Sequence, residues 1–173
     1  MGTRRNAANA AAANTAAQES VNVATTVATS EKLNLTVNAV TVFDNDGKAS
    51  VRLTFDESIK GYKANGLDFV ESEVNYVDFA RPALTKQLCG LNDLIADYRA
   101  CRTEAFGQKE WAIILRGAKL TVVRHHHAAG ELTGRQDANG VDVAYQRDCY
   151  TSDIVGVKLT DAATRKLERA TEL

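Results

Sequence analysis

Cysteine and proline are scarce in this chain, and each scarcity excludes a class of structure. The 173 residues contain one proline and three cysteines, an odd number with no Cys-x-x-Cys pair. A disulfide framework or a structural zinc knuckle needs more cysteines in closer pairs, so we expect reduced thiols and a cytoplasmic protein. No run of about 18 apolar residues is present and no apolar segment follows Arg4 and Arg5, so neither a membrane span nor a signal peptide is predicted.

The sequence motifs of the common enzyme classes are missing as well. The chain contains no Gly-x-Ser-x-Gly, no phosphate-binding P-loop, no Gly-x-Gly-x-x-Gly and no His-Glu-x-x-His. Cys149 could meet a histidine in space, but a cysteine within a strand is more often a small buried side chain. The sequence therefore predicts a protein that is not an enzyme and that needs no cofactor.

Net charge is also nearly absent, at −1 for the whole chain, and by itself it predicts no partner. The charge is nevertheless distributed unevenly. Residues 81–124 hold eight basic and four acidic side chains, which gives this segment a net charge of +4. A basic segment within a near-neutral protein is a candidate for contact with phosphates.

The first thirty residues differ in composition from the rest. Residues 1–30 consist almost entirely of Ala, Asn, Thr, Ser, Gln and Val, with no large apolar side chains. Such a segment buries too little apolar surface to offset the entropy that ordering would cost. We therefore expect a disordered tail over residues 1–30 and a single domain over residues 31–173.

Two runs of alternating apolar residues around a turn open this domain. The first run places one set of side chains on a single face of a strand: Leu33, Leu35, Val37, Ala39 and Phe43. Asn45-Asp46-Gly47 is hairpin-turn chemistry, and a second alternating run, Ala49–Phe55, follows it. A polar loop containing Gly61 then leads to a third strand over Leu67–Phe79. The apolar phase of that strand slips twice, as a β-bulge or a bend between sheets would produce.

A helical pattern follows the third strand. Pro82 suits the first turn of a helix, and the residues of its apolar stripe recur at helical spacing: Leu84, Leu88, Leu91, Ile95 and Tyr98. A second helical stretch covers Glu104–Arg116, with Gly117 as its C-terminal cap. Alternation returns over Ala118–His127, before a long polar loop. One strand or a bent pair is expected over Val141–Leu159, and Thr160 is expected to cap a short helix over Asp161–Thr171.

The predicted fold class is mainly β with inserted helices, that is α+β. The element order β-β-β-α-β-β resembles the five-stranded OB barrel, here with a short C-terminal helix added. Three stretches, Gly117–Leu120, Ala129–Glu131 and Arg147–Tyr150, resemble small OB-type single-stranded DNA-binding proteins of phages and mobile elements. The chain departs from bacterial proteins of this class in having a helical pair and in lacking an acidic C-terminal tail.

The resemblance implies sequence-nonspecific binding of single-stranded DNA during replication or recombination, in the host cytoplasm if a phage encodes the chain. A single-strand binder needs cations for phosphates and aromatic faces for bases. The residues that fit these roles on the predicted strands and loops are Arg52, Lys60, Tyr62, Lys63, Lys119, Arg124, His125, His127, Tyr145, Arg147 and Tyr150. For any one of them, a solvated polar face is the competing explanation.

The run His125-His126-His127 is the one metal-like feature. On a strand, His125 and His127 point the same way and His126 points the opposite way. A zinc site needs at least a third ligand, and the chain has no other histidine. Only Glu131 or Asp148 could complete such a set, so no metal site is predicted.

A second class of function is compatible with the same sequence. A structural or assembly protein, such as a virion accessory protein, could use the tail and the sheet edges to bind protein. RNA in place of DNA, and a homo-oligomer, are also left open by the sequence. Salt dependence separates the two classes, because phosphate binding weakens steeply with ionic strength and an apolar protein interface does not.

Overall fold

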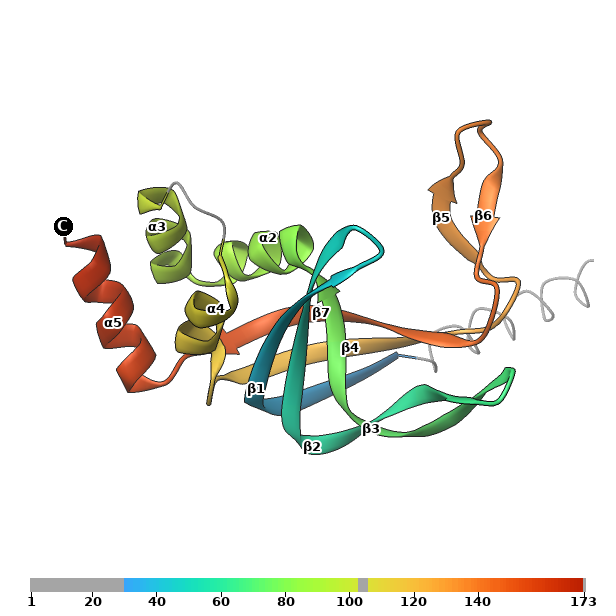
Figure 1. Ribbon diagram of the computed structural model, residues 1–173, viewed down its shortest axis with the longest axis horizontal. Helices are drawn as coiled ribbons and strands as arrows, with labels where there is room; N and C mark the ends of the chain where they lie inside the picture. The colour runs from blue at the N-terminus through green and yellow to red at the C-terminus, as the bar shows by residue number, and fades with distance from the viewer. Residues whose placement is uncertain (1–29, 103–105, 173) are drawn as a thin grey trace, which may run out of the picture. The chain divides into compact units, whose positions relative to one another are not determined.

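Five strands in the described part of the chain form one sheet (Figure 1). The structure is a computed structural model that describes residues 30–102 and 106–172. The strands follow the order β3-β2-β1-β4-β7, with the bounds β1 Ser30–Asn45, β2 Lys48–Asn65, β3 Asp68–Ala80, β4 Lys119–His127 and β7 Cys149–Lys158. The pairs β1–β2, β2–β3 and β4–β7 are antiparallel. The mainly β prediction is confirmed, whereas the tail predicted over residues 1–30 lies, apart from Ser30, outside the described residues.

The first four strands have the spatial order of a Greek key. Hairpins join β1, β2 and β3, and a long helical connection then returns the chain so that β4 lies beside β1. At this junction the Val37 amide donates to the Ala118 carbonyl at 2.9 Å, and the Gly117 amide donates to the Val37 carbonyl at 2.8 Å. Among the described strands, the edges β3 and β7 do not pair. The sheet is therefore not closed into a barrel, so the five-stranded OB-like barrel expected from the element order is not confirmed.

The first hairpin forms as its turn sequence predicts. Asp46 and Gly47 both have positive φ, 50° and 77°, which is the conformation that a two-residue hairpin turn of the favoured twist requires. The buried face of β1 differs from the expectation after Val37. A bulge between Val37 and Ala39 shifts the phase, so that Val40, and not Ala39 or Phe43, enters the core. A bulge adds a residue to one strand, and an analysis based on simple alternation does not detect that extra residue.

The polar loop expected around Gly61 is instead the second half of β2. This strand continues to Asn65 and turns into β3 through Gly66, whose φ is +67°. The predicted phase slip has a structural cause on this hairpin. Between consecutive pairs in the register, β2 advances from Thr54 to Ile59 while β3 moves only from Tyr76 to Val74. The sequence of this half of β2 resembles a loop, because its outer residues are exposed, mostly polar and do not pack on the core.

Val74 on β3 leaves no room for a side chain at Gly61. A Cβ at this position would lie 2.7 Å from Cγ2 of Val74, a stiff β-branched side chain. We expect Gly61→Ala to lower the free energy of unfolding by about 1–3 kcal/mol, as overpacking does. Gly90→Ala is the matched control, since a Cβ added there would meet no neighbouring atom within 4 Å and alanine favours its helix. Urea denaturation of both variants checks this; equal stabilities would contradict the tight packing at Gly61.

Three helices connect β3 to β4: α2 (Arg81–Leu91), α3 (Asp93–Cys101) and α4 (Gln108–Leu115). The single apolar stripe predicted from Pro82 onward is broken at Asn92, whose side chain accepts a hydrogen bond from the Ile95 amide at 3.2 Å and so caps α3. Helix α2 packs against β2, β3 and β7. All three helices contribute to the core, through Leu84, Leu88, Ile95, Trp111, Ile114 and Leu115.

The C-terminal part contains a hairpin whose first strand lies in the expected polar loop and whose second lies at the start of the strand or bent pair expected over Val141–Leu159. Strands β5 (Leu132–Gln136) and β6 (Asp142–Ala144) form a separate two-stranded sheet that projects from the five-stranded one (Figure 1). Helix α5 (Asp161–Thr171) has the predicted bounds, and Thr160 caps it by accepting from the Ala163 amide at 3.1 Å. It packs on α3 and α4. No helix among the described residues has the length and apolar character needed to cross a membrane.

Candidate nucleic-acid interface

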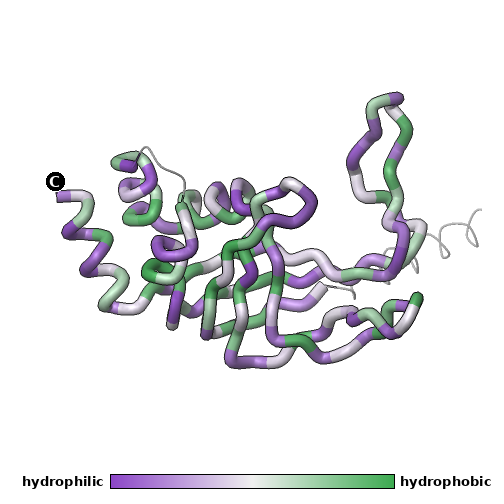
Figure 2. Tube along the Cα trace, viewed as in Figure 1, coloured by the Kyte–Doolittle hydropathy of each residue, from purple (hydrophilic) through white to green (hydrophobic). Residues whose placement is uncertain are grey.

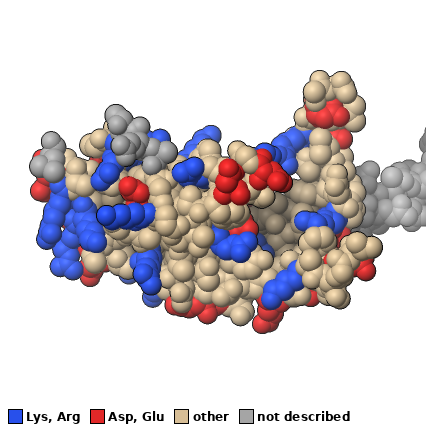
Figure 3. Space-filling model, in the orientation of Figure 1, with Lys and Arg blue, Asp and Glu red and all other residues tan. Residues whose placement is uncertain are grey.

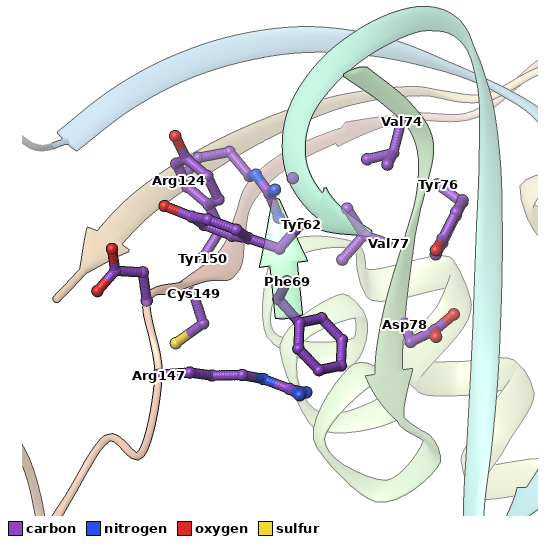
Figure 4. A pocket seen from close by; sticks show the side chains of 12 residues that line it. Tyr62, Phe69, Val74, Tyr76, Val77, Asp78, Arg124, Arg147, Cys149 and Tyr150 are labelled. Carbon is purple, nitrogen blue, oxygen red and sulfur yellow. The ribbon is translucent and has the colours of Figure 1, made fainter. Parts of the chain in front are cut away.

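A cavity of about 330 Å³ lies between the β2–β3 hairpin and the beginning of β7 (Figure 4). We call it the aromatic cavity, because tyrosine and phenylalanine side chains make up much of its wall. Its lining comes from β2, β3 and β4, from the segment leading into β7 and from the first two residues of β7. The lining residues are Gly61, Tyr62, Phe69, Val74, Tyr76, Val77, Asp78, Arg124, Arg147, Asp148, Cys149 and Tyr150.

Tyr62, His126 and Tyr150 form a ring cluster at this cavity. The centroids of Tyr62 and Tyr150 are 5.7 Å apart, and His126 meets Tyr150 edge-on at 5.0 Å. The Tyr62 hydroxyl and His126 Nε2 share a hydrogen bond of 2.8 Å. Tyrosine hydroxyls are neutral at physiological pH, and burial raises the pKa of both of these tyrosines further. The cluster thus offers fixed aromatic faces and polar edges to a planar ligand.

Arg124 is buried behind this cluster and ties three strands together. Only 6% of the residue is exposed. Its guanidinium donates to Ser152 Oγ on β7 at 2.6 Å and to the Lys60 carbonyl on β2, and it lies 4.9 Å from the Tyr150 centroid. These contacts bridge the two sides of the open sheet. Arg124 lines the aromatic cavity, but its main contacts are to the protein itself.

Arg147 and Phe69 meet at the mouth of the cavity (Figure 4). The Arg147 guanidinium lies 3.5 Å from the centroid of the Phe69 ring, a cation–π contact. Both residues are exposed, Phe69 by 42%. Within the described residues, Arg147 forms no ion pair. Its charge and its donors are therefore accessible from solvent.

Arg52 does not line the cavity, but it contacts two residues that do, Asp78 and Tyr76. It donates to both carboxylate oxygens of Asp78, at 2.8 and 3.0 Å, and lies 4.2 Å from the Tyr76 centroid. Hydrogen bonding to Asp78 raises the pKa of Arg52. Because its charge is already matched by Asp78, Arg52 contributes less to phosphate attraction than the sequence suggested.

The remaining predicted residues lie outside the cavity. Lys60 and Lys63 are exposed on the outer half of β2, and Lys119 pairs in register with Lys158 at the far end of β4. On the outward face of β4, His125 lies 3.5 Å from an Asp153 oxygen.

His127 is engaged on both ring nitrogens. Nδ1 is 3.0 Å from Glu131 and Nε2 is 2.9 Å from Thr151, while the ring stacks on Tyr145 at 4.4 Å. Its hydrogen bond to Glu131 is the main cause that lowers the pKa of that carboxyl. No three His, Cys, Asp or Glu residues within 30–102 and 106–172 are placed to hold a metal ion.

Sequence reasoning missed three residues of the cavity region: His126, Phe69 and Tyr76. His126 shares the strand parity of Arg124, so the alternation of β4 could have identified it. Phe69 and Tyr76 could not be placed, because the extension of β2 had been interpreted as a loop and the β2–β3 register was unknown.

Cys149 offers a direct probe of this cavity. It lines the wall and is half-buried, whereas Cys101 is exposed. Burial raises the pKa of the Cys149 thiol, and the thiolate is the reactive form. We expect iodoacetamide to modify Cys101 before Cys149, measured by peptide mass spectrometry over time. Faster modification of Cys149 would contradict a folded, partly closed cavity.

Comparison with known proteins adds no assignment. No protein-family model matches the chain, and no curated protein matches it in sequence. The residues of the aromatic cavity are therefore the basis for any functional inference.

Proposed function

We propose that this protein binds single-stranded nucleic acid and holds an unstacked base in the aromatic cavity. The observation that carries the proposal is that aromatic and basic side chains from several segments meet at one cavity. Tyr62, Phe69 and Tyr150 come from separate segments and surround one cavity together with the accessible cation Arg147. Aromatic faces for bases and cations for the backbone are what a single-strand binder needs. A volume of about 330 Å³ lies at the lower end of the range of about 300–1,000 Å³ for ligand pockets, which suits one base.

The surroundings of the cavity predict modest electrostatic attraction. Lys60, Lys63 and Arg147 supply accessible positive charge near Tyr62. Opposite them on β3, Glu73 pairs in register with Lys60, and Glu71 pairs with Tyr62. These carboxylates partly cancel the cations, so stacking contributes a larger share of the binding than it would on a strongly basic surface.

The strand arrangement supports an OB-like origin for this site. The OB fold is a partly open, five-stranded Greek-key barrel that binds oligonucleotides on strands 2 and 3 and with the loops joining strands 1–2 and 4–5. Here the Greek-key order is present, and β7 lies beside β4 as a fifth strand. The aromatic cavity lies on β2 and β3 and on the connection that enters β7. We propose on this basis a sequence-nonspecific role in replication or recombination of a phage or mobile element.

The test is a titration of fluorescently labelled oligo-dT at two salt concentrations. Binding should be measurable at low salt and should weaken as salt rises, since phosphate contacts release counterions. Saturating oligo-dT should also slow the alkylation of Cys149. A folded sample that shows no binding at low salt would refute the proposal.

A structural or assembly role is the second candidate, and exposed apolar side chains favour it. Leu67 is fully exposed and Val70 is 45% exposed on the β2–β3 hairpin, whose tip is apolar in Figure 2. Leu132 and Val141 are 60% and 59% exposed on the β5–β6 hairpin. Exposed apolar groups of this kind mark protein contacts. Self-association that persists at high salt, in a sample without oligo-dT binding, would favour this role.

A further inference from the structure

A second groove, chemically unlike the aromatic cavity, lies between α4 and α5. Its volume is about 510 Å³, and three cations line it: Lys109 from α4, Arg116 directly after α4 and Lys166 from α5. We call it the basic groove. The segment following β7 contributes Thr160 to its wall, while Cys149 at the start of β7 lines the aromatic cavity. The two sites therefore lie at opposite ends of β7.

The side chains that line the basic groove carry positive charge only. Its lining contains no carboxylate. Within the described residues, none of the three cations forms an ion pair, and all three are exposed. Figure 3 shows Lys and Arg side chains gathered over the α5 end of the domain, at the left. The first turn of α5 forms part of the same wall, and Asp161 in that turn, which does not line the groove, offsets part of its helix dipole. The groove thus attracts anions.

The lining also indicates which part of a nucleic acid it suits. No aromatic side chain is present in the groove, so it offers no stacking face for a base. The side chains between its cations are small or aliphatic, with Ile113 as the largest. Phosphates can be bound by exposed lysine and arginine without further recognition, because this contact is long-range and sequence-independent.

We propose that the basic groove binds the backbone phosphates of the same strand whose base occupies the aromatic cavity. This inference rests on the proposed function and adds a second contact to it. Strand β7 has ten residues, which at about 3.3 Å per residue separates the two sites by roughly 33 Å. At the stacked rise of about 3.4 Å per nucleotide, a strand of about ten nucleotides spans that distance. An oligonucleotide of four nucleotides is too short to contact both sites at once.

The experiment compares the salt dependence of binding for dT20 and dT4. The groove variant carries Arg116→Ala and Lys166→Ala, and the control variant carries Lys48→Ala and Lys86→Ala. All four side chains are exposed, so each variant should fold, which a thermal melt verifies. For dT20, the slope of log K against log salt should become shallower by about 1.4 in the groove variant, since each lost single-strand phosphate contact removes about 0.7. The control variant should keep the wild-type slope.

The short oligonucleotide decides whether the sites act together. The dT4 slope should be the same in the groove variant and the wild type, because dT4 bound at the cavity does not reach the groove. An equal loss of slope for dT4, or equal dT20 slopes in the groove and control variants, would overturn the inference. In either of these cases, continued loss of dT20 binding in Tyr62→Ala would leave the proposed function intact. Absence of wild-type binding to both oligonucleotides would remove both proposals.

Discussion

Replacing Tyr62 or Tyr150 by alanine should weaken oligo-dT binding by about 1–3 kcal/mol, the usual value of one base stacked on an aromatic ring. That loss corresponds to roughly 5- to 150-fold in Kd. Both rings line the aromatic cavity, with centroids 5.7 Å apart. Neither carries charge, so the slope of log K against log salt should not change. Fluorescence titrations at several salt concentrations measure both quantities.

Two matched variants locate the effect. Tyr62→Phe keeps the ring and removes only the hydroxyl that bonds to His126, so it should retain most of the affinity. Tyr145 stacks on His127 outside the cavity, so Tyr145→Ala should bind nearly as well as the wild type. If Tyr145→Ala lost as much affinity as Tyr62→Ala, base contacts would be spread over the outer face of β4 and the cavity would not be the site.

Arg124→Ala should lower the free energy of unfolding by about 3 kcal/mol, since hydrogen bonds from a charged group contribute roughly 1.5–3 kcal/mol each. Arg124 is buried and donates to Ser152 and to the Lys60 carbonyl. Its removal leaves that carbonyl without this donor and loosens the link between β2 and β7. The single tryptophan, Trp111, is fully buried, so its fluorescence in urea reports the transition.

Arg147→Ala is the matched control for this prediction. Arg147 also carries a guanidinium beside an aromatic ring, but it is exposed. Its removal should change stability by no more than about 0.5 kcal/mol and should make the salt slope of oligo-dT binding shallower by about 0.7. Comparing the two variants thus distinguishes an arginine that stabilises the fold from one that contacts the ligand. A stable Arg124→Ala protein with a shallower slope would show instead that Arg124 contacts phosphate directly.

Local patterns in the sequence determined much of the secondary structure. The residues Asn45–Gly47 favour a turn with positive φ between two alternating runs, and the hairpin forms there. Thr160, as the expected N-cap, placed the start of α5 correctly, and the helix has the predicted bounds. Gly117, with φ of +81°, ends the α4 region as a C-terminal cap should. Each of these features depends on residues that are neighbours in the chain, so the sequence alone contains the physical cause.

Only the tertiary structure decided which side chains meet. Alternation assigned Arg124 to a face of β4, but its burial depends on contacts with Lys60 on β2 and with Tyr150 and Ser152 on β7, which the sequence does not predict. At the cavity, Tyr62 on β2 lies close to Tyr150 on β7. The sequence did not predict the extension of β2 that carries Tyr62, because that segment is polar. The basic segment over 81–124 was likewise divided: Arg124 lies at the cavity, and Lys109 and Arg116 lie at the basic groove. Contacts between distant segments depend on strand order, bulges and register, and these are set by packing of the whole core.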